Sequence, residues 1–178
     1  MPEVVLDSTV LVSAFLTKTG VSAELLVHAR RKAYHLCLTD QIIEETQQVL
    51  LEYQRIRKRY HYPDRSVIQF VKGLRAISHL STNLPEIRAV LRDPNDDAVI
   101  ACALAAKANY IVTRDKDLLS MEKYERVRIV APEKFMKILR ENPQDLINSA
   151  SERILHRLDA TNCRSSPSTK SMPNIMDP

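Results

Sequence analysis

Apolar positions along the chain fall into short continuous runs that alternate with longer segments of helical period. Runs typical of buried strands occur at residues 4–6, 34–39, 109–113 and 126–131, and a short strand is expected around residues 79–81. The intervening helical segments are residues 8–16, 21–33, 39–56, 63–78, 96–108 and 132–142. This alternation predicts an α/β fold: a three-layer α/β/α sandwich around a mostly parallel sheet.

The ends of several helices carry their own signals. Thr39 or Asp40 is expected to cap the helix that starts there, and Pro63 and Pro132 stand at or near the start of theirs. The helix at 39–56 has an apolar face that includes Ile42, Leu50 and Tyr53, which we expect to be buried. After about residue 143 the character changes to Ser, Pro and Asn. We therefore predict one domain over residues 1–143 and a C-terminal extension over 144–178, a short helix followed by a disordered tail.

Composition excludes several classes of protein. With only 2 glycines, the chain cannot contain a P-loop or a G-x-G-x-x-G dinucleotide motif. The 5 histidines and 3 cysteines form no zinc-binding spacing, and two of the cysteines are expected in the core. No apolar run is long enough for a membrane span and the start has no signal-peptide pattern, so the cytoplasm is the expected location. The net charge of +4 and pI near 9.0 favour a polyanionic partner.

Asp7 interrupts the apolar start of the chain, between VVL and STVLVSAF. Burial of an unpaired carboxylate is costly, so its position needs a reason. One reading is that Asp7 ends the strand and caps the next helix; the other is that it faces a cleft and holds a cation there. If Asp7 has the second role, capping falls to Ser8 or Thr9.

Other carboxylates are placed by the pattern near the same edge of the sheet. Asp115 follows the strand at 109–113, and the carboxyl ends of parallel strands line the ligand crevice. Asp97 opens a buried helix, where acidic residues also suit the helix dipole. On the helix that follows Thr39, the apolar face is centred roughly 100° from Glu45 and roughly 160° from Glu44. Glu45 is thus expected at the edge of the buried face, with Glu44 in solvent.

Carboxylates that converge without matching Lys or Arg repel one another unless a cation neutralises them. Carboxylate oxygens in an open, hydrated site suit Mg²⁺ or Mn²⁺. Such an ion activates water for attack on a phosphodiester. A basic, metal-dependent phosphodiesterase is the hypothesis that these residues favour.

The same segments, VVLDSTVLVSAF, TDQIIEETQQVL and RDPNDDAVIACALAAKANYIVTRDKDLL, resemble the PIN-domain ribonucleases, especially the toxin-like bacterial branch, over roughly residues 3–140. The resemblance implies a Rossmann-like topology, endonucleolytic cleavage of RNA, Mg²⁺ or Mn²⁺ as cofactor, homodimers and a cognate antitoxin. It implies that the metal site consists of Asp7, Glu45, Asp97 and Asp115, with Thr113, Ser8, Asp117 and Asp93 in support. The chain departs from the family at Thr9, where many relatives have Asn, and this puts a minor polar contact in question.

The stretch EYQRIRKRYHY, residues 52–62, combines cations with aromatic rings. Basic groups can follow phosphates and exposed rings can stack on bases. The candidate RNA contacts are Arg55, Arg57, Lys58, Arg59 and Tyr60. The alternative is an ordinary solvated helix end with Tyr53 in the core.

Two other functions remain open from the sequence. An aspartate-based phosphatase also begins with Asp after a buried strand, but it needs a second Asp where this chain has Thr9. A non-catalytic RNA-binding or regulatory module would not need all four acidic positions. A metal-dependent endoribonuclease is the leading hypothesis, and the resemblance to the toxin-like branch implies the toxin of a toxin–antitoxin pair.

Overall fold

The computed structural model describes residues 1–87 and 94–141. The strands are β1 (Glu3–Leu6), β2 (His35–Leu38), β3 (Ser78–Leu80), β4 (Tyr110–Val112), β5 (Lys123–Tyr124) and β6 (Val127–Val130). The helices are α1 (Ser8–Leu16), α2 (Val21–Arg30), α3 (Asp40–Glu52), α4 (Gln54–Tyr60), α5 (Asp64–Ile77), α6 (Pro94–Ala105), α7 (Lys116–Ser120) and α8 (Pro132–Glu141). Asp93 and the predicted extension at 144–178 lie outside the described residues.

The six strands form one sheet in the order β3-β2-β1-β4-β6-β5. All neighbouring pairs are parallel except β5 with β6. β1 lies in the middle, with Val5 opposite Cys37 of β2 on one side and Ile111 of β4 on the other. Strands of this kind are buried on both faces, which explains why they are continuous apolar runs.

Helices cover both faces of the sheet. α1 packs against α2 and α3, α3 against α5, and α2 against α8, so that these helices form one continuous layer. α6 packs on β1, β2 and β4, and α7 packs on β6. The chain reverses direction across the sheet between β3 and β4, so right-handed crossovers place α6 on the opposite face from α1 and α3. The predicted three-layer α/β/α fold is confirmed.

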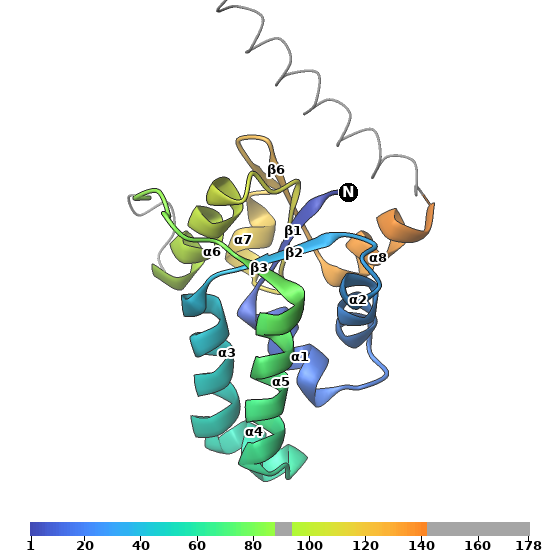
Figure 1. The fold of residues 1–178 in the computed structure, drawn as a ribbon, viewed down its shortest axis with the longest axis vertical. Helices are drawn as coiled ribbons and strands as arrows, with labels where there is room; N and C mark the ends of the chain where they lie inside the picture. The colour runs from blue at the N-terminus through green and yellow to red at the C-terminus, as the bar shows by residue number, and fades with distance from the viewer. Residues whose placement is uncertain (88–93, 142–178) are drawn as a thin grey trace, which may run out of the picture.

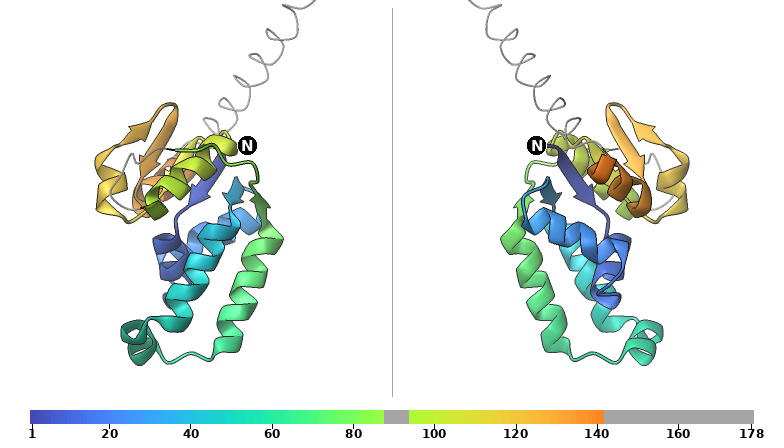
Figure 2. Two further views of the ribbon diagram at one scale, coloured as in Figure 1. Left: turned by 90° about the vertical axis from the view of Figure 1, so that its left-hand side faces the viewer. Right: turned by 90° about the vertical axis from the view of Figure 1, so that its right-hand side faces the viewer.

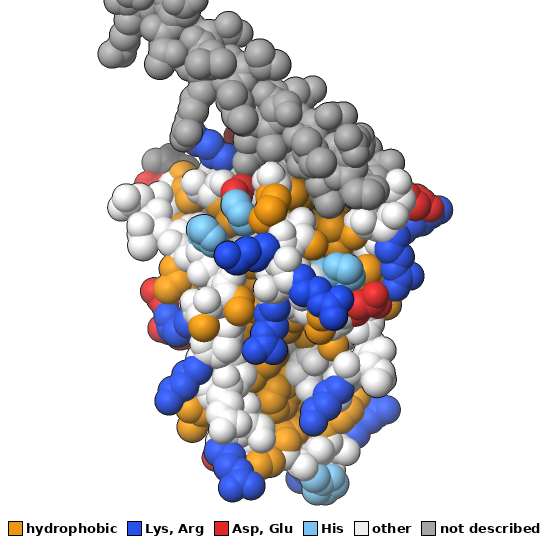
Figure 3. Space-filling model, turned by 45° about the vertical axis from the view of Figure 1, so that its right-hand side comes forward, with side chains coloured by type: hydrophobic (Ala, Val, Ile, Leu, Met, Phe, Trp, Pro, Cys, Tyr) orange, Lys and Arg blue, Asp and Glu red, His pale blue; other side chains and the backbone are white. Residues whose placement is uncertain are grey.

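α3 and α5 form an arm that extends away from the sheet, with α4 at its tip (Figures 1 and 2). The prediction of one helix over 39–56 is wrong, because the chain leaves helical geometry at Tyr53 and α4 starts anew at Gln54. Tyr53 is 61% exposed, so its expected burial is also wrong. The reason is that the arm extends past the core: no residue of α4, all of which the structure describes, is buried. In the space-filling view, Lys and Arg side chains are spread over the part of the molecule that holds the arm (Figure 3).

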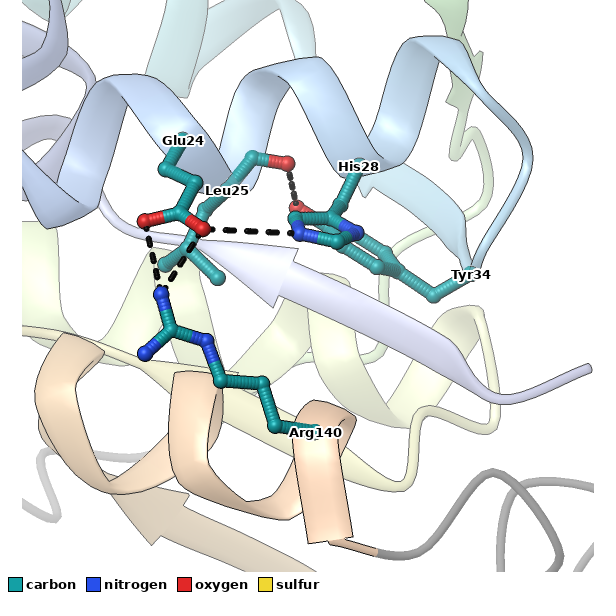
Figure 4. Close-up of polar contacts among 5 residues, drawn as sticks. All are labelled: Glu24, Leu25, His28, Tyr34 and Arg140. Atoms are coloured by element: carbon teal, nitrogen blue, oxygen red, sulfur yellow. Dashed lines mark hydrogen bonds and ion pairs between the residues drawn. The ribbon is translucent and has the colours of Figure 1, made fainter.

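The closing helix α8 is held beside α2 by polar and aromatic contacts, and Figure 4 draws the polar ones. The buried Tyr34 donates its hydroxyl to the Leu25 carbonyl at 2.8 Å, and its ring meets Phe135 of α8 at 5.5 Å. At the surface, Arg140 donates to the Glu24 carboxylate at 2.8 Å. The hydrogen bond from Arg140 lowers the pKa of Glu24. Pro132 is the first residue of α8, as predicted.

Most predicted elements are present, and two short ones were not predicted. α5 buries Val67, Val71 and Leu74 on its inner face, where Phe70 is half-buried. Cys37 and Cys102 are both buried, as expected. α7 and β5 are too short for a periodic signal. The Asp115 side chain, an N-cap of the kind that starts helices, was the available clue to α7.

Within the described residues, no single helix is long and apolar enough to cross a membrane; only the pair α1 and α2, bent by 101°, meets the requirements of length and composition.

Candidate active site

Asp7 follows β1 directly and is 5% exposed. Its backbone N–H donates to the Val112 carbonyl at 3.0 Å, which continues the β1–β4 ladder one residue beyond the strand. Its carboxylate accepts hydrogen bonds from three hydroxyls: Thr9 at 2.6 Å, Thr113 at 2.7 Å and Ser8 at 3.3 Å. No cationic side chain of the described residues is among its partners. The chain therefore holds the orientation of Asp7 without supplying a positive charge.

Thr113 connects the ends of the two central strands. It is fully buried, and its hydroxyl donates to Asp7 while accepting from the Asp115 N–H at 2.9 Å. Thr9 has a parallel arrangement, since its hydroxyl donates to Asp7 and accepts from the Arg114 N–H at 3.2 Å. The sequence pointed to Thr113 and Ser8 as supporting groups but treated Thr9 as a candidate helix cap and a departure from the family pattern. The structure shows that Thr9 makes the shortest hydrogen bond to Asp7.

Within the described residues, no side chain caps the start of α1. Asp7 occupies the N-cap position, but its carboxylate does not accept from the helix N–H groups. The expectation that Ser8 or Thr9 would cap instead is wrong, because both hydroxyls point to Asp7. The polar side chains of this turn are directed to the strand ends rather than to the helix.

Asp115 is half-buried beside Asp7 and Thr113, and its side chain caps a helix. Its Oδ1 accepts from the N–H groups of Asp117 at 2.7 Å and Leu118 at 3.2 Å, which caps α7. Asp117 is exposed and supplies this contact through its backbone. Because Thr113 binds both Asp7 and the Asp115 N–H, the structure brings these two acidic residues to the same strand ends, as predicted.

Glu45 and Asp97 lie on the helices that meet at the same edge of the sheet. α3 begins after β2, α6 packs against α3 as well as β1 and β4, and Asp97 lies in the first turn of α6. Glu45 is half-buried while Glu44 is exposed, which is the difference that helical geometry predicted. Asp96 and Asp97 are both half-buried, so exposure does not separate them.

A sequence model of the PIN domain family matches residues 3–117, which is more than half of the chain. This chain belongs to the PIN-domain family. No curated protein matches the chain. The matched region runs from the start of β1 into α7, so this PIN domain contains all four of the predicted acidic residues within it.

PIN domains are generally nucleases that need a divalent metal. The donors at this edge are carboxylate and hydroxyl oxygens, which suit a hard cation such as Mg²⁺ or Mn²⁺. Within residues 1–87 and 94–141, no three His, Cys, Asp or Glu side chains converge closely enough to hold an ion as they stand. The chemistry of the donor set in this PIN domain therefore fits the metal.

Positive groups flank the edge of the sheet in this PIN domain. Arg114 follows Thr113, is exposed and pairs with Glu133 at 2.7 Å. Burial acts to raise the pKa of Glu133, but the backbone N–H at the start of α8 and Arg114 outweigh it and leave the pKa lowered. The predicted RNA contacts on α4 are elsewhere: Arg55, Lys58, Arg59 and Tyr60 are exposed at the tip of the arm.

Proposed function

We propose that this PIN domain is a Mg²⁺- or Mn²⁺-dependent endoribonuclease that hydrolyses RNA phosphodiester bonds. The observation that carries the proposal is the buried Asp7 carboxylate, which three hydroxyls orient and which has no cationic partner in the described part of the chain. A carboxylate in that setting is stabilised when an external cation binds to it. Membership of a family that is generally nucleolytic gives the reaction class.

Each acidic residue has a place in this mechanism. Asp7, Glu45, Asp97 and Asp115 would hold the ion, which when bound activates water and offsets charge on the phosphodiester. Thr113, Thr9 and Ser8 keep the Asp7 carboxylate in one orientation by their hydrogen bonds. Asp117 stands next to this group, and Asp93 lies outside the described residues.

The RNA backbone is proposed to contact the tip of the arm. Arg55, Lys58 and Arg59 are exposed on α4, and Arg59 lies over the Tyr60 ring at 5.6 Å. Arg57 is less available, because it is half-buried and pairs with Asp64 at 2.7 Å. Cationic side chains can bind the phosphates of an RNA strand, and an exposed aromatic ring beside them can stack on its bases.

The resemblance of the sequence motifs to the toxin-like branch supports a more specific role. We propose that the protein acts in the cytoplasm as the toxin of a toxin–antitoxin pair, as a homodimer that a cognate antitoxin inhibits. Co-expression provides the test: the chain alone should arrest growth, and a neighbouring gene product that restores growth should co-purify with it. Growth that is unaffected by the active chain would contradict this role.

A non-catalytic RNA-binding module is the alternative. It is favoured by the present engagement of Asp115 in capping α7 and by the absence of three converging ligands among the described side chains. Such a module would bind RNA without cleaving it, whichever divalent ion is supplied.

The deciding experiment is cleavage of a mixed RNA pool by the purified full chain, with sequencing of the cut ends. We expect cleavage with Mg²⁺ or Mn²⁺ and none in EDTA. The adjacent glutamates give a matched pair of variants: Glu45→Gln should lower the rate at least about 100-fold, whereas Glu44→Gln should leave it within about twofold. Equal rates for the two variants, or full activity in EDTA, would contradict the proposed metal site.

A further inference from the structure

A hollow of about 670 Å³ lies between the end of α1 and the turn from α4 to α5. A volume of this size is typical of sites for small molecules or single nucleotides. Aromatic rings dominate its lining: Phe15, Tyr60, His61, Tyr62 and Phe70.

The inner rings are held in place by contacts with one another and with the core. Tyr62 donates its hydroxyl to the Leu50 carbonyl at 2.7 Å. Its ring meets Phe15 edge-on at 4.8 Å, and Phe15 meets Phe70 at 5.3 Å. The hollow therefore has a rigid aromatic floor, which lowers the entropy cost of binding a flat ligand.

The rim of the hollow is cationic. Lys18 is exposed in the lining. Arg57 and Arg59 do not line the hollow, but their guanidinium groups lie over the rings of Tyr62 and Tyr60 at 5.5 and 5.6 Å, and Arg57 also pairs with Asp64. None of the described residues that line the hollow is acidic. Figure 3 shows a stripe of apolar side chains on this side of the molecule, with Lys and Arg on both sides of it.

We propose that this hollow binds an unpaired base of single-stranded RNA. The base stacks on Tyr60, which is 41% exposed, and the adjoining phosphate pairs with Lys18. Gln69 and Ser66 offer hydrogen-bonding groups to the edge of the base. The combination of aromatic rings, a cationic rim and no acidic group fits a nucleotide better than it fits a purely apolar ligand.

The hollow is within reach of the acidic site along one helix. α1 starts directly after Asp7 and ends at Leu16, which lines the hollow. A rise of 1.5 Å per residue makes this distance about 12 Å. A single RNA strand of a few nucleotides can therefore span both places. The inference deepens the proposed function, on which it rests for the choice of RNA as ligand.

The first test measures binding of a fluorescein-labelled, single-stranded RNA of eight nucleotides to the full chain by anisotropy, in EDTA. Tyr60→Ala should raise Kd about 5- to 100-fold, whereas Tyr60→Phe should keep it within about twofold because the ring remains. Tyr53→Ala is the matched control, since Tyr53 is more exposed but does not line the hollow. Unchanged binding by Tyr60→Ala, or an equal loss in Tyr53→Ala, would overturn the inference.

The second test measures the salt dependence of the same binding. Lys18→Gln should lower the slope of log K against log salt by about 0.7, and Lys72→Gln, on the exposed side of α5, should change it less. An RNA duplex that binds as tightly as the single strand would overturn the base-stacking site. Because the binding assay is run in EDTA, it reports on the hollow without cleavage. Binding that depends on Tyr60, together with no cleavage when Mg²⁺ or Mn²⁺ is supplied, supports the hollow and contradicts the nuclease. If the chain cleaves RNA while Tyr60→Ala still binds RNA normally, the nuclease is supported and the base-binding hollow is contradicted.

Discussion

The two ends of β1 each place a carboxylate on the central strand, in opposite settings. At the amino end, Glu3 has its Oε1 2.8 Å from His35 Nδ1 and accepts from the Cys37 thiol at 3.0 Å. At the carboxyl end, Asp7 accepts from three hydroxyls and has no cationizable partner among the described side chains. Glu3 thus has a histidine and a thiol as partners, whereas Asp7 has hydroxyl partners only, and the proposed function adds an external cation there. Under the proposed function, Glu3 is a structural carboxylate and Asp7 is the functional one at the other end of the same strand.

Neutralising the two carboxylates is expected to have the largest and most different effects. Asp7→Asn should lower RNA cleavage at least about 1000-fold, because the ion loses its buried ligand. Its Tm should be unchanged or higher, since a buried carboxylate without a cationic partner is costly. Glu3→Gln should leave cleavage within about twofold and lower the free energy of unfolding by about 1 kcal/mol through the weaker contact with His35.

Cleavage rates and thermal unfolding of the two purified variants provide the measurement. Equal activity of Asp7→Asn and Glu3→Gln would remove the distinction between the ends of the strand.

The hydroxyl that joins Asp7 to Asp115 gives the next effect. Thr113→Val should lower cleavage about 10- to 100-fold and cost about 1–3 kcal/mol, because Asp7 loses a donor and the Asp115 N–H loses its acceptor. Thr113→Ser should keep most of the cleavage rate and most of the stability, because the hydroxyl remains. Thr46 is the matched control, because it is also fully buried but donates to Ile42 within α3, so Thr46→Val should keep the cleavage rate. A loss of rate in Thr46→Val as large as in Thr113→Val would point to a general defect of packing.

The thiol at the amino end should affect stability alone. Cys37 is buried, and desolvation raises the pKa of its thiol, with the hydrogen bond to Glu3 acting in the same direction. Cys37→Ala should lower the free energy of unfolding by about 1–2 kcal/mol, as measured by urea denaturation, and leave cleavage unchanged. A fall in cleavage at full stability would show that the amino end takes part in the reaction.

A third carboxylate, Glu24, extends the comparison to the surface, where the effect should be smallest. Arg140 lowers the pKa of Glu24, so their pairing stabilises the fold above the ordinary pKa near 4.5 and is lost as pH falls through the lowered value. Arg140→Gln should therefore cause a small fall in Tm at pH 7 that shrinks as the pH falls below 4.5. Thermal melts across this range test it, and a difference that grows toward acid pH would have the wrong sign.

The sequence was sufficient for most of the fold because buried strands and amphipathic helices repeat within a few residues. The apolar runs located the five longer strands, and the helical period separated Glu45 from Glu44. Prediction from the sequence failed where an element was too short or where burial depended on the tertiary structure. β5 has only two residues. Tyr53 follows the apolar pattern of α3 but is exposed, because the arm has already left the core at that point.

The sequence by itself determined most of the elements, the family and the position of Asp7 after a buried strand. Only the tertiary structure decided which groups meet Asp7, because Thr113 lies 106 residues away and reaches it through the pairing of β1 with β4. The same holds for the aromatic hollow, where Phe15 and Tyr62 become neighbours through the packing of α1 beside the arm. Local spacing specifies helices and strands; contacts across the chain depend on the order of strands in the sheet, which no local pattern records.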